Sequence, residues 1–325
     1  MTFALRRAGF LIWSLLFSFL PPAAAQNYPA KSIRLIIPYA PGGPNDIFGR
    51  MMAQKLSEAF GQQVVADNRG GASGVIGAEL AARAAPDGYT LLLGGVALFA
   101  MNPVLLAKLP YEPLRDFAPV SLIASTPFIL VSHPSLPATN VQELIALARS
   151  RPGQLNFGSA GAGGPPRLAA ELFKIMAGID MVHVAYSGGA LVLTATLAGE
   201  VHLFFSSIAP ALPLVKDGKL KGFAVTSATR SAVVPEFPTI AESGLPGYAI
   251  ENWFAVAAPA ATPRAIVARL NAELVKAIKM GDIRKRFIDL GADPLGSTPD
   301  ELAAYIRSEL AKWGKVVKAA GIKPE

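Results

Sequence analysis

The fold is set by an apolar run and the turn that follows it, residues 33–46, with the sequence IRLIIPYAPGGPND. The run from Ile33 to Ile37 has the length and composition of a buried β-strand. Prolines and glycines at 41–44 force a turn, and a helical pattern follows over about residues 45–60. The backbone N–H groups of a helix that begins at the carboxyl end of a strand can bind an anion. The stretch therefore indicates either an anion site or an ordinary strand-to-helix turn.

An export signal is expected at the N-terminus. Arg6 and Arg7 precede an apolar run at 8–20, and small residues follow at 23–25. This is the pattern of a secretory signal peptide, and its apolar run is shorter than the roughly 20 residues that span a bilayer. We therefore predict a signal peptide over residues 1–25, general secretion rather than the twin-arginine route, and an exported mature chain that is not embedded in a membrane.

The composition argues against several classes of protein. No cysteine is present, so the chain has no disulfide, thiol nucleophile or thiolate metal site. The chain has 30 Lys and Arg and 23 Asp and Glu; the signal holds two arginines and no acid, so the mature net charge is +5. A nucleic-acid-binding protein would gather this charge with aromatic residues on one face, whereas the densest basic run is only Arg284–Arg286. We predict no nucleic-acid partner, no metal and no cofactor, and a charge compatible with a small acidic ligand.

The hydrophobic pattern predicts two series of alternating strands and helices, at 33–95 and 140–225. The strands are short apolar runs without two-residue alternation, which is typical of parallel sheets covered by helices on both faces. A proline-rich passage between the two series contains two short strands, at 120–123 and 128–131, which suggests a crossover between domains. The other strands are expected at 33–37, 64–66, 91–95, 155–158, 181–184, 201–205 and 222–225.

The C-terminal part is expected to return to the first series. An extended stretch at 249–258 leads into a helical region, in which Thr262–Pro263 opens one helix and 297–301 opens another with a capping pattern. This order predicts an α/β protein with two lobes, a hinge and a ligand cleft between them. The expected domains are 26–126 together with 250–325, and 127–249.

A second glycine-rich loop, residues 158–167, again follows a strand and precedes a helix. Its glycines leave backbone N–H groups uncovered, and Ser159 adds a hydroxyl donor. The spacing is not a dinucleotide-binding fingerprint, because the third glycine would fall at Pro166, and the loop lacks the end of a nucleotide-binding loop. One such loop at the mouth of each predicted domain suggests two anion-binding loops that face each other.

A secreted α/β hydrolase with Ser159 as its nucleophile is the alternative from another class. Phe157 stands where a nucleophile elbow has a glycine, so the serine fits that motif on one side only. Its general base would have to be His133, His183 or His202. The last two lie in strand patterns, where a structural histidine is commoner, and we predict that the protein is not an enzyme.

Several blocks in order resemble the periplasmic receptors of tripartite tricarboxylate transporters, the Bug family. The resemblance extends over essentially the whole mature chain. It implies a type II periplasmic binding fold, in which two α/β domains close on a small organic carboxylate and deliver it to membrane transporter subunits. A receptor that signals through a sensor protein would use the same closure. The blocks are YAPGG at 39–43 with Asp46, NRG at 68–70, APDGYTLL at 85–92, NP at 102–103, DFAPV at 116–120, GSAG at 158–161 and WG at 313–314.

In that family the carboxylate of the ligand is held by the first and second loops, partly through ordered water. Asp46 is itself anionic, so it is better suited to cap its helix or to order water than to touch the carboxylate. The resemblance assigns Pro41, Gly42, Gly43 and Asp46 to the first loop and Ser159, Gly161 and Gly163 to the second. The predicted ligand-binding set also includes Tyr39, Gly95, Arg167, Tyr186, Ser206 and Ser207.

Some positions depart from the family pattern. Arg167 stands where a histidine is usual, Ser187 where a lysine is usual, and Ser206 and Ser207 where an acid or amide is often found. The missing acid near Ser206 favours a second carboxylate or a neutral tail on the ligand over an ammonium group. Arg167 either contacts the distal end of the ligand or is a solvated or capping arginine.

Overall fold

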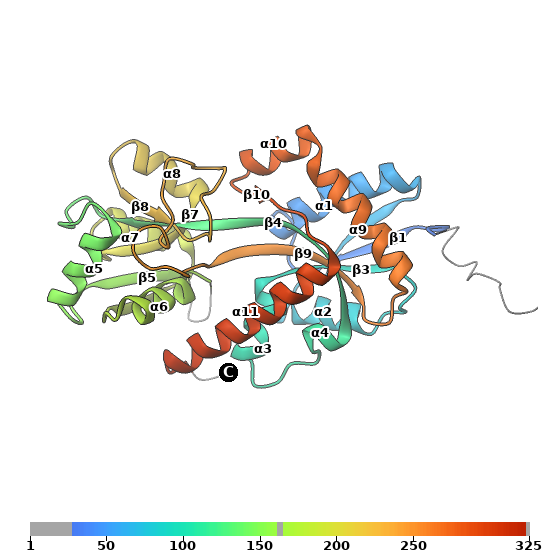
Figure 1. Ribbon diagram of the computed structural model, residues 1–325, viewed down its shortest axis with the longest axis horizontal. Helices are drawn as coiled ribbons and strands as arrows, with labels where there is room; N and C mark the ends of the chain where they lie inside the picture. Colours follow the sequence, from blue (N-terminus) through green and yellow to red (C-terminus); the bar gives the residue numbers. More distant parts are fainter. Residues whose placement is uncertain (1–27, 161–164, 323–325) are drawn as a thin grey trace, which may run out of the picture.

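A computed structural model describes residues 28–160 and 165–322 of the chain. Strands and helices alternate along both halves of the molecule, and long strands join the halves (Figure 1). The α/β class predicted from the hydrophobic pattern is confirmed. The predicted signal peptide, residues 1–25, lies outside the described residues. Among the described residues, no helix combines the length and the apolar character that a membrane crossing needs.

Three parallel strands build the sheet of the first half, in the order β2-β1-β3. The apolar side chains of β1 and β3 are buried because helices cover the sheet, as continuous apolar runs predict, whereas Val65 of the edge strand β2 is exposed. The predicted strands and helices of this half are confirmed, with small shifts at their ends. The elements are β1 (Ile33–Ile37), α1 (Pro44–Phe60), β2 (Val64–Asn68), α2 (Val75–Ala82) and β3 (Thr90–Gly95).

The second half repeats this arrangement with parallel strands in the order β7-β5-β6. Its last strand, β8 (Lys221–Val225), pairs antiparallel with a long strand, β4 (Phe117–Ser132). The predicted alternation of strands and helices is confirmed here as well. The other elements are α5 (Val141–Ser150), β5 (Asn156–Ala160), α6 (Pro165–Ala177), β6 (Val182–Tyr186), α7 (Gly189–Leu197), β7 (Leu203–Ser207) and α8 (Ile208–Lys216).

Two antiparallel strands, β4 (Phe117–Ser132) and β9 (Glu251–Pro259), run between the halves (Figure 1). The prediction of two short strands broken at Pro127 is wrong, because β4 is one continuous strand. Pro127 is the last β4 residue that pairs with β9, and β7 and β8 become the partners from Phe128 onward. A proline interrupts a strand only where its missing N–H is needed, and Pro127 falls where the partners change. The predicted domain boundary near residue 126 stays a prediction.

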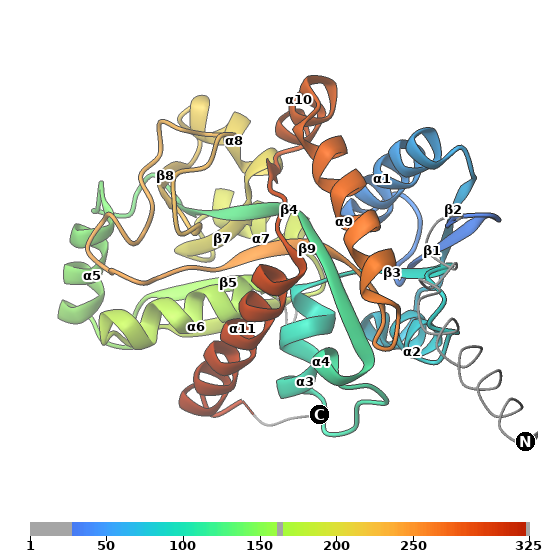
Figure 2. The same cartoon turned by 45° about the vertical axis from the view of Figure 1, so that its right-hand side comes forward.

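Helices of the C-terminal part pack back onto both halves. The final helix, α11 (Pro299–Ala319), crosses β4 and lies beside α6 at its C-terminal end (Figure 2). The predicted capping box is confirmed, since the Thr298 side chain accepts from the Glu301 N–H and the Glu301 carboxylate accepts from the Thr298 N–H. The other α-helices and strands of the described residues are α3 (Asn102–Leu105), α4 (Pro113–Asp116), α9 (Arg264–Lys279), α10 (Gly281–Asp289) and β10 (Asp293–Pro294). Helix α9 begins one residue later than predicted, with Pro263 as its N-cap.

A hydrogen bond accepted by Glu309 joins α11 to β9. Glu309 is 3% exposed, and its Oε2 accepts hydrogen bonds from the indole N–H of Trp253 in β9 at 3.2 Å and of Trp313 at 3.0 Å. Lys312 forms an ion pair with Glu309 and also donates to the Ala249 carbonyl oxygen at 2.9 Å. Buried polar groups need such partners, so this network fixes where α11 lies on β9.

Glu251 places a titratable carboxyl at the start of β9. The residue is half-buried and pairs with Pro127 across the strands, and its Oε1 accepts a hydrogen bond from the Ser125 hydroxyl at 3.2 Å. Loss of solvation on burial is the main cause that raises the pKa of Glu251 to about 7, and the negative charges of Asp293 and Glu309 add to it. The hydrogen bond from Ser125 and the charge of Lys312 oppose this shift.

Glu251→Gln is expected to change how stability depends on pH. The pKa of Glu251 is about 7 in the folded chain and 4.5 ordinarily, so its contribution to stability is complete below pH 4.5 and is lost as pH rises through 7. The wild-type protein should lose about 1–3 kcal/mol of unfolding free energy through this group between about pH 5 and 7.5, and the variant should not. Urea unfolding at both pH values measures the difference. Glu236→Gln, on an exposed loop, is the control, and an unchanged pH slope in Glu251→Gln would contradict the expectation.

Candidate functional site

The first loop brings backbone donors to the N-terminus of α1. Gly42 has φ = +87°, a conformation that favours glycine, and turns the chain into Gly43, the N-cap of the helix. The first helical hydrogen bond runs from the Ile47 N–H to the Gly43 carbonyl oxygen at 3.0 Å. Within the described part of the chain, no group accepts a hydrogen bond from the N–H of Gly43, Asn45 or Asp46. These donors, at the positive end of the helix dipole, could hold an anion.

The buried side chain of Asp46 accepts a hydrogen bond from the backbone of this loop. It is 5% exposed, and its Oδ2 accepts the Gly42 N–H at 2.9 Å. Its Oδ1 accepts hydrogen bonds from Asn68 Nδ2 and Arg50 Nε, each at 2.9 Å. Burial alone would raise the pKa of Asp46, but the bonds from Arg50, Gly42 and Asn68 outweigh it and hold the pKa below its usual value. Because the Gly42 N–H is used inside the loop, the role that the structure gives Gly42 is conformational.

The loop after β2 lies against the first loop. Asn68, the last residue of β2, donates through Nδ2 to the Tyr39 carbonyl oxygen at 3.1 Å as well as to Asp46. Arg50 Nη2 donates to Asn68 Oδ1 at 2.8 Å, so one side chain from α1 bridges both loops. Burial of the Tyr39 hydroxyl raises its pKa to about 12. The loops after β1 and β2 therefore meet at the carboxyl edge of the sheet, as expected for an open parallel sheet.

Gly95 has a packing role at the end of β3. It is buried opposite Phe254 of β9, and a Cβ at this position would collide with the Trp253 carbonyl oxygen. Only glycine allows β9 to approach β3 so closely. A ligand contact at Gly95 stays a prediction.

Ser159 is fully buried near the end of β5, and its Oγ lies 2.6 Å from Nε2 of His183. Phe157 and His183 are partners in the parallel β5–β6 pair, and Ser159 is on the same face two residues further along. Burial first, and then the positive charges of Arg167 and Lys174, lower the pKa of His183 to about 4. Among the described residues no carboxylate bonds to the other ring nitrogen of His183, so the pair lacks the acid of a hydrolase triad.

The remaining predicted residues of the second half lie near one edge of its sheet. Tyr186 ends β6 and is half-buried, while Ser206 is buried in β7 and donates its hydroxyl to the Ser207 carbonyl oxygen at 3.1 Å. Ser207 is exposed at the N-cap of α8. Arg167, in the first turn of α6, has its Nε 4.0 Å from Glu171 Oε1. Gly161 and Gly163 lie outside the described residues.

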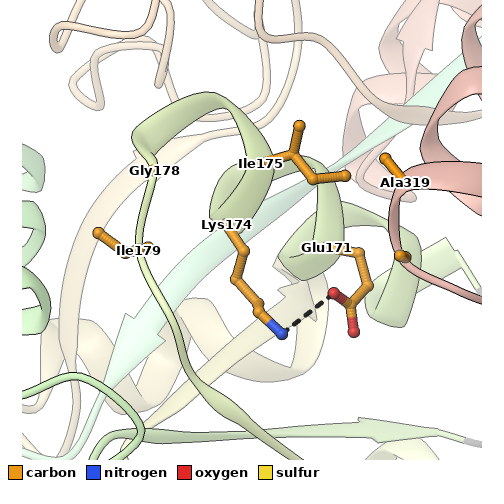
Figure 3. Close-up of a pocket in the computed structure, with 7 residues that line it drawn as sticks. Glu171, Lys174, Ile175, Gly178, Ile179 and Ala319 are labelled. Carbon is orange, nitrogen blue, oxygen red and sulfur yellow. Dashed lines mark ion pairs between the residues drawn. The ribbon is translucent and has the colours of Figure 1, made fainter.

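A pocket of about 280 Å³ lies between α6 and α11 (Figure 3). Its polar side chains pair with each other, because Lys174 Nζ lies 3.2 Å from Glu171 Oε2. None of the predicted ligand-binding residues lines it. The lining residues are Glu171, Lys174, Ile175, Gly178, Ile179, Ala319 and Ala320.

Three side chains at the two edges are missing from the predicted set. Arg50 and Asn68 hold Asp46, and His183 holds Ser159. The spacing of Arg50 four residues after Asp46 on a predicted helix is a signal for the first of these contacts. The contact from Asn68 to Asp46 joins β2 to α1, and the contact from His183 to Ser159 joins two strands, so no local spacing reveals them.

Comparisons with known proteins agree with this architecture. The family model described as "Tripartite tricarboxylate transporter family receptor" matches residues 48–322. Protein BugT of Bordetella pertussis is 36% identical over 303 residues, which cover 93% of each chain. Among solved structures, R. palustris Rpa4515 with adipate is 38% identical with a TM-score of 0.74 and covers 92% of this chain and 100% of its own. MatC from Rhodopseudomonas palustris with bound malate is 33% identical with a TM-score of 0.69, covering 89% and 100%.

These matches decide between the classes of protein that the sequence left open. They extend over nearly the whole chain and are receptors rather than enzymes, so the predicted solute-binding fold is confirmed and the hydrolase alternative is excluded. The chain belongs to the tripartite tricarboxylate transporter receptor family, the group that includes the Bug proteins.

Proposed function

We propose that this protein is a periplasmic receptor that captures a small organic carboxylate between its two halves and delivers it to a tripartite tricarboxylate-type membrane transporter. The observation that carries the proposal is the N-terminus of α1, where Gly43, Asn45 and Asp46 offer N–H groups with no acceptor among the described residues. A hydrogen bond to a charged group contributes about 1.5–3 kcal/mol, and a helix N-terminus adds about 0.3–1 kcal/mol. Two or three such donors are enough to hold one carboxylate.

The second half supplies the other wall of the proposed cleft. Tyr186, Ser206 and Ser207 lie at the carboxyl ends of β6 and β7, where open α/β sheets bind ligands. The positive charge of Arg167, in the first turn of α6, suits an anionic ligand at this edge. Related receptors were solved with adipate and with malate, so dicarboxylates of four to six carbons are the first compounds to test.

Closure would bend the crossing strands. In this proposal residues 26–126 with 250–325 form one domain and 127–249 the other, and the hinge lies where β4 changes partners, at Pro127 and Glu251. A ligand between the lobes would stabilise the closed arrangement by its contacts with both.

A thermal-shift screen tests the proposal. The protein is unfolded and refolded to remove any copurified ligand, then scanned with mono-, di- and tricarboxylates and with neutral analogues. A ligand at about 100 times its Kd adds about 2.7 kcal/mol to the free energy of unfolding, which raises the Tm by several degrees. A rise with carboxylates and none with the matching neutral amides is the expected result. No shift with any carboxylate would contradict the proposal.

A further inference from the structure

Asp46 creates an electrostatic problem for the proposed site. Its carboxylate is buried in the first turn of α1, and it is bonded to the Gly42 N–H at 2.9 Å. The same turn carries the N–H groups proposed to bind the carboxylate of the ligand. Two negative charges this close repel each other strongly unless a positive charge compensates one of them.

Arg50 is the cation that faces Asp46. Its Nε lies 2.9 Å from Asp46 Oδ1, and its Nη2 donates to Asn68 Oδ1 at 2.8 Å. Asp67, which precedes Asn68 in β2, is already paired with Arg34 and Arg69. Among the described residues, Arg50 is therefore the charged side chain that bonds to Asp46.

We propose that Arg50 is the positioning residue that allows the α1 N-terminus to accept a carboxylate, by neutralising Asp46 and by bracing Asn68 against the first loop. This inference rests on the proposed function. Arg50 acts through Asp46 and Asn68 and need not touch the ligand. Without Arg50, the carboxylate of Asp46 keeps its bonds to Gly42 and Asn68, but its charge opposes an incoming anion.

Because the Arg50 side chain is exposed, a role in ligand binding can be distinguished from a role in the stability of the fold. The side chain of Arg50 is 53% exposed and that of Asp46 is 7% exposed, so water screens the ion pair from the Arg50 side. When Arg50 is lost, Asp46 still keeps its hydrogen bonds from Gly42 and Asn68. Loss of Arg50 should therefore weaken binding while the Tm changes by only a few degrees. A pair with the same spacing lies at the end of α2, where Nη2 of Arg83, the C-cap, lies 2.6 Å from Glu79 Oε1.

Isothermal titration at pH 8 tests this role, with malate and adipate as probes and the tighter one carried through the variants. Arg50→Gln keeps an amide that can donate to Asp46 but removes the charge, and we expect Kd to rise at least 10-fold. Arg50→Lys should stay within about 3-fold of the wild-type protein and Arg83→Gln within 2-fold. In the double variant Arg50→Gln with Asp46→Asn, which removes both charges, binding should recover at least 3-fold relative to Arg50→Gln.

Each outcome bears on a different claim. If Arg50→Gln binds within 2-fold of the wild-type protein, or the double variant binds no more tightly than Arg50→Gln, the role of Arg50 is overturned while the proposed function stands. If the wild-type protein binds neither these probes nor any carboxylate of the thermal screen, the proposed function fails, and this inference fails with it. Arg50→Met serves as a second variant, and circular dichroism and Tm confirm that each variant is folded.

Discussion

Replacing Gly43 with valine is expected to weaken carboxylate binding at least 100-fold while the protein stays folded. Gly43 is the N-cap of α1 with φ = −82° and ψ = 171°, which is extended backbone that any residue adopts. A Cβ there would have the Ala40 carbonyl oxygen as its nearest neighbour, at 4.0 Å. The branched side chain therefore fits the fold but covers the N–H groups of the first turn. Loss of two hydrogen bonds to a carboxylate, about 3 kcal/mol or more, corresponds to a factor of 100 or more in Kd.

Titration calorimetry with the dicarboxylate that binds the wild-type protein measures this effect. Gly281→Val is the matched control, because Gly281 also stands at the start of a helix, and a Cβ added there would meet no atom within 4 Å. Gly281 opens α10, and the next residue, Asp282, pairs with Lys55, which lies about three turns along α1 from Gly43. We therefore expect this control to bind like the wild-type protein. Binding by Gly43→Val within 3-fold of the wild-type value would move the site away from the N-terminus of α1.

The largest loss of stability is expected from Glu309→Ala. The substitution leaves the buried indole N–H groups of Trp253 and Trp313 without their acceptor and separates Lys312 from its partner. An unsatisfied buried donor costs about 1–3 kcal/mol, so two of them should lower the unfolding free energy by about 2–4 kcal/mol. Urea unfolding followed by circular dichroism measures the change.

Glu273→Ala is the control for this prediction. Glu273 forms an ion pair with Lys276 on α9, and 76% of the Lys276 side chain is exposed. Loss of this ion pair should therefore lower the unfolding free energy by less than about 0.5 kcal/mol. A loss in Glu309→Ala no greater than in Glu273→Ala would show that the network does not hold α11 on β9.

The strands of both sheets could be predicted because their signal is local. Continuous apolar runs such as Leu91–Leu93 bury both faces of a strand, and the turns between them contain glycine and proline. The crossing strand β4 could not be predicted as one element. The effect of Pro127 depends on where β9 ends and β7 begins, and these partners come from more than seventy residues further along the chain.

Part of the candidate site could likewise be predicted from the local sequence, and part could not. The strand, turn and helix of the first loop follow from residues 33–46, since glycine and proline act on their own backbone. The hydrogen bond from Asn68 to Asp46 joins β2 to α1, and the one between Ser159 and His183 joins β5 to β6. Such contacts depend on strand order and register, which a single sequence with a weak pattern does not specify.

A crystal structure of the mature protein with its tightest dicarboxylate tests the central claim most directly. The claim predicts one carboxylate of the ligand within hydrogen-bonding distance, about 2.7–3.2 Å, of the N–H groups of Gly43 and Asn45 or Asp46. It also predicts that residues at the carboxyl edge of the β5, β6 and β7 sheet contact the ligand from the other side. A ligand bound away from the N-terminus of α1, for example in the pocket between α6 and α11, would contradict the claim.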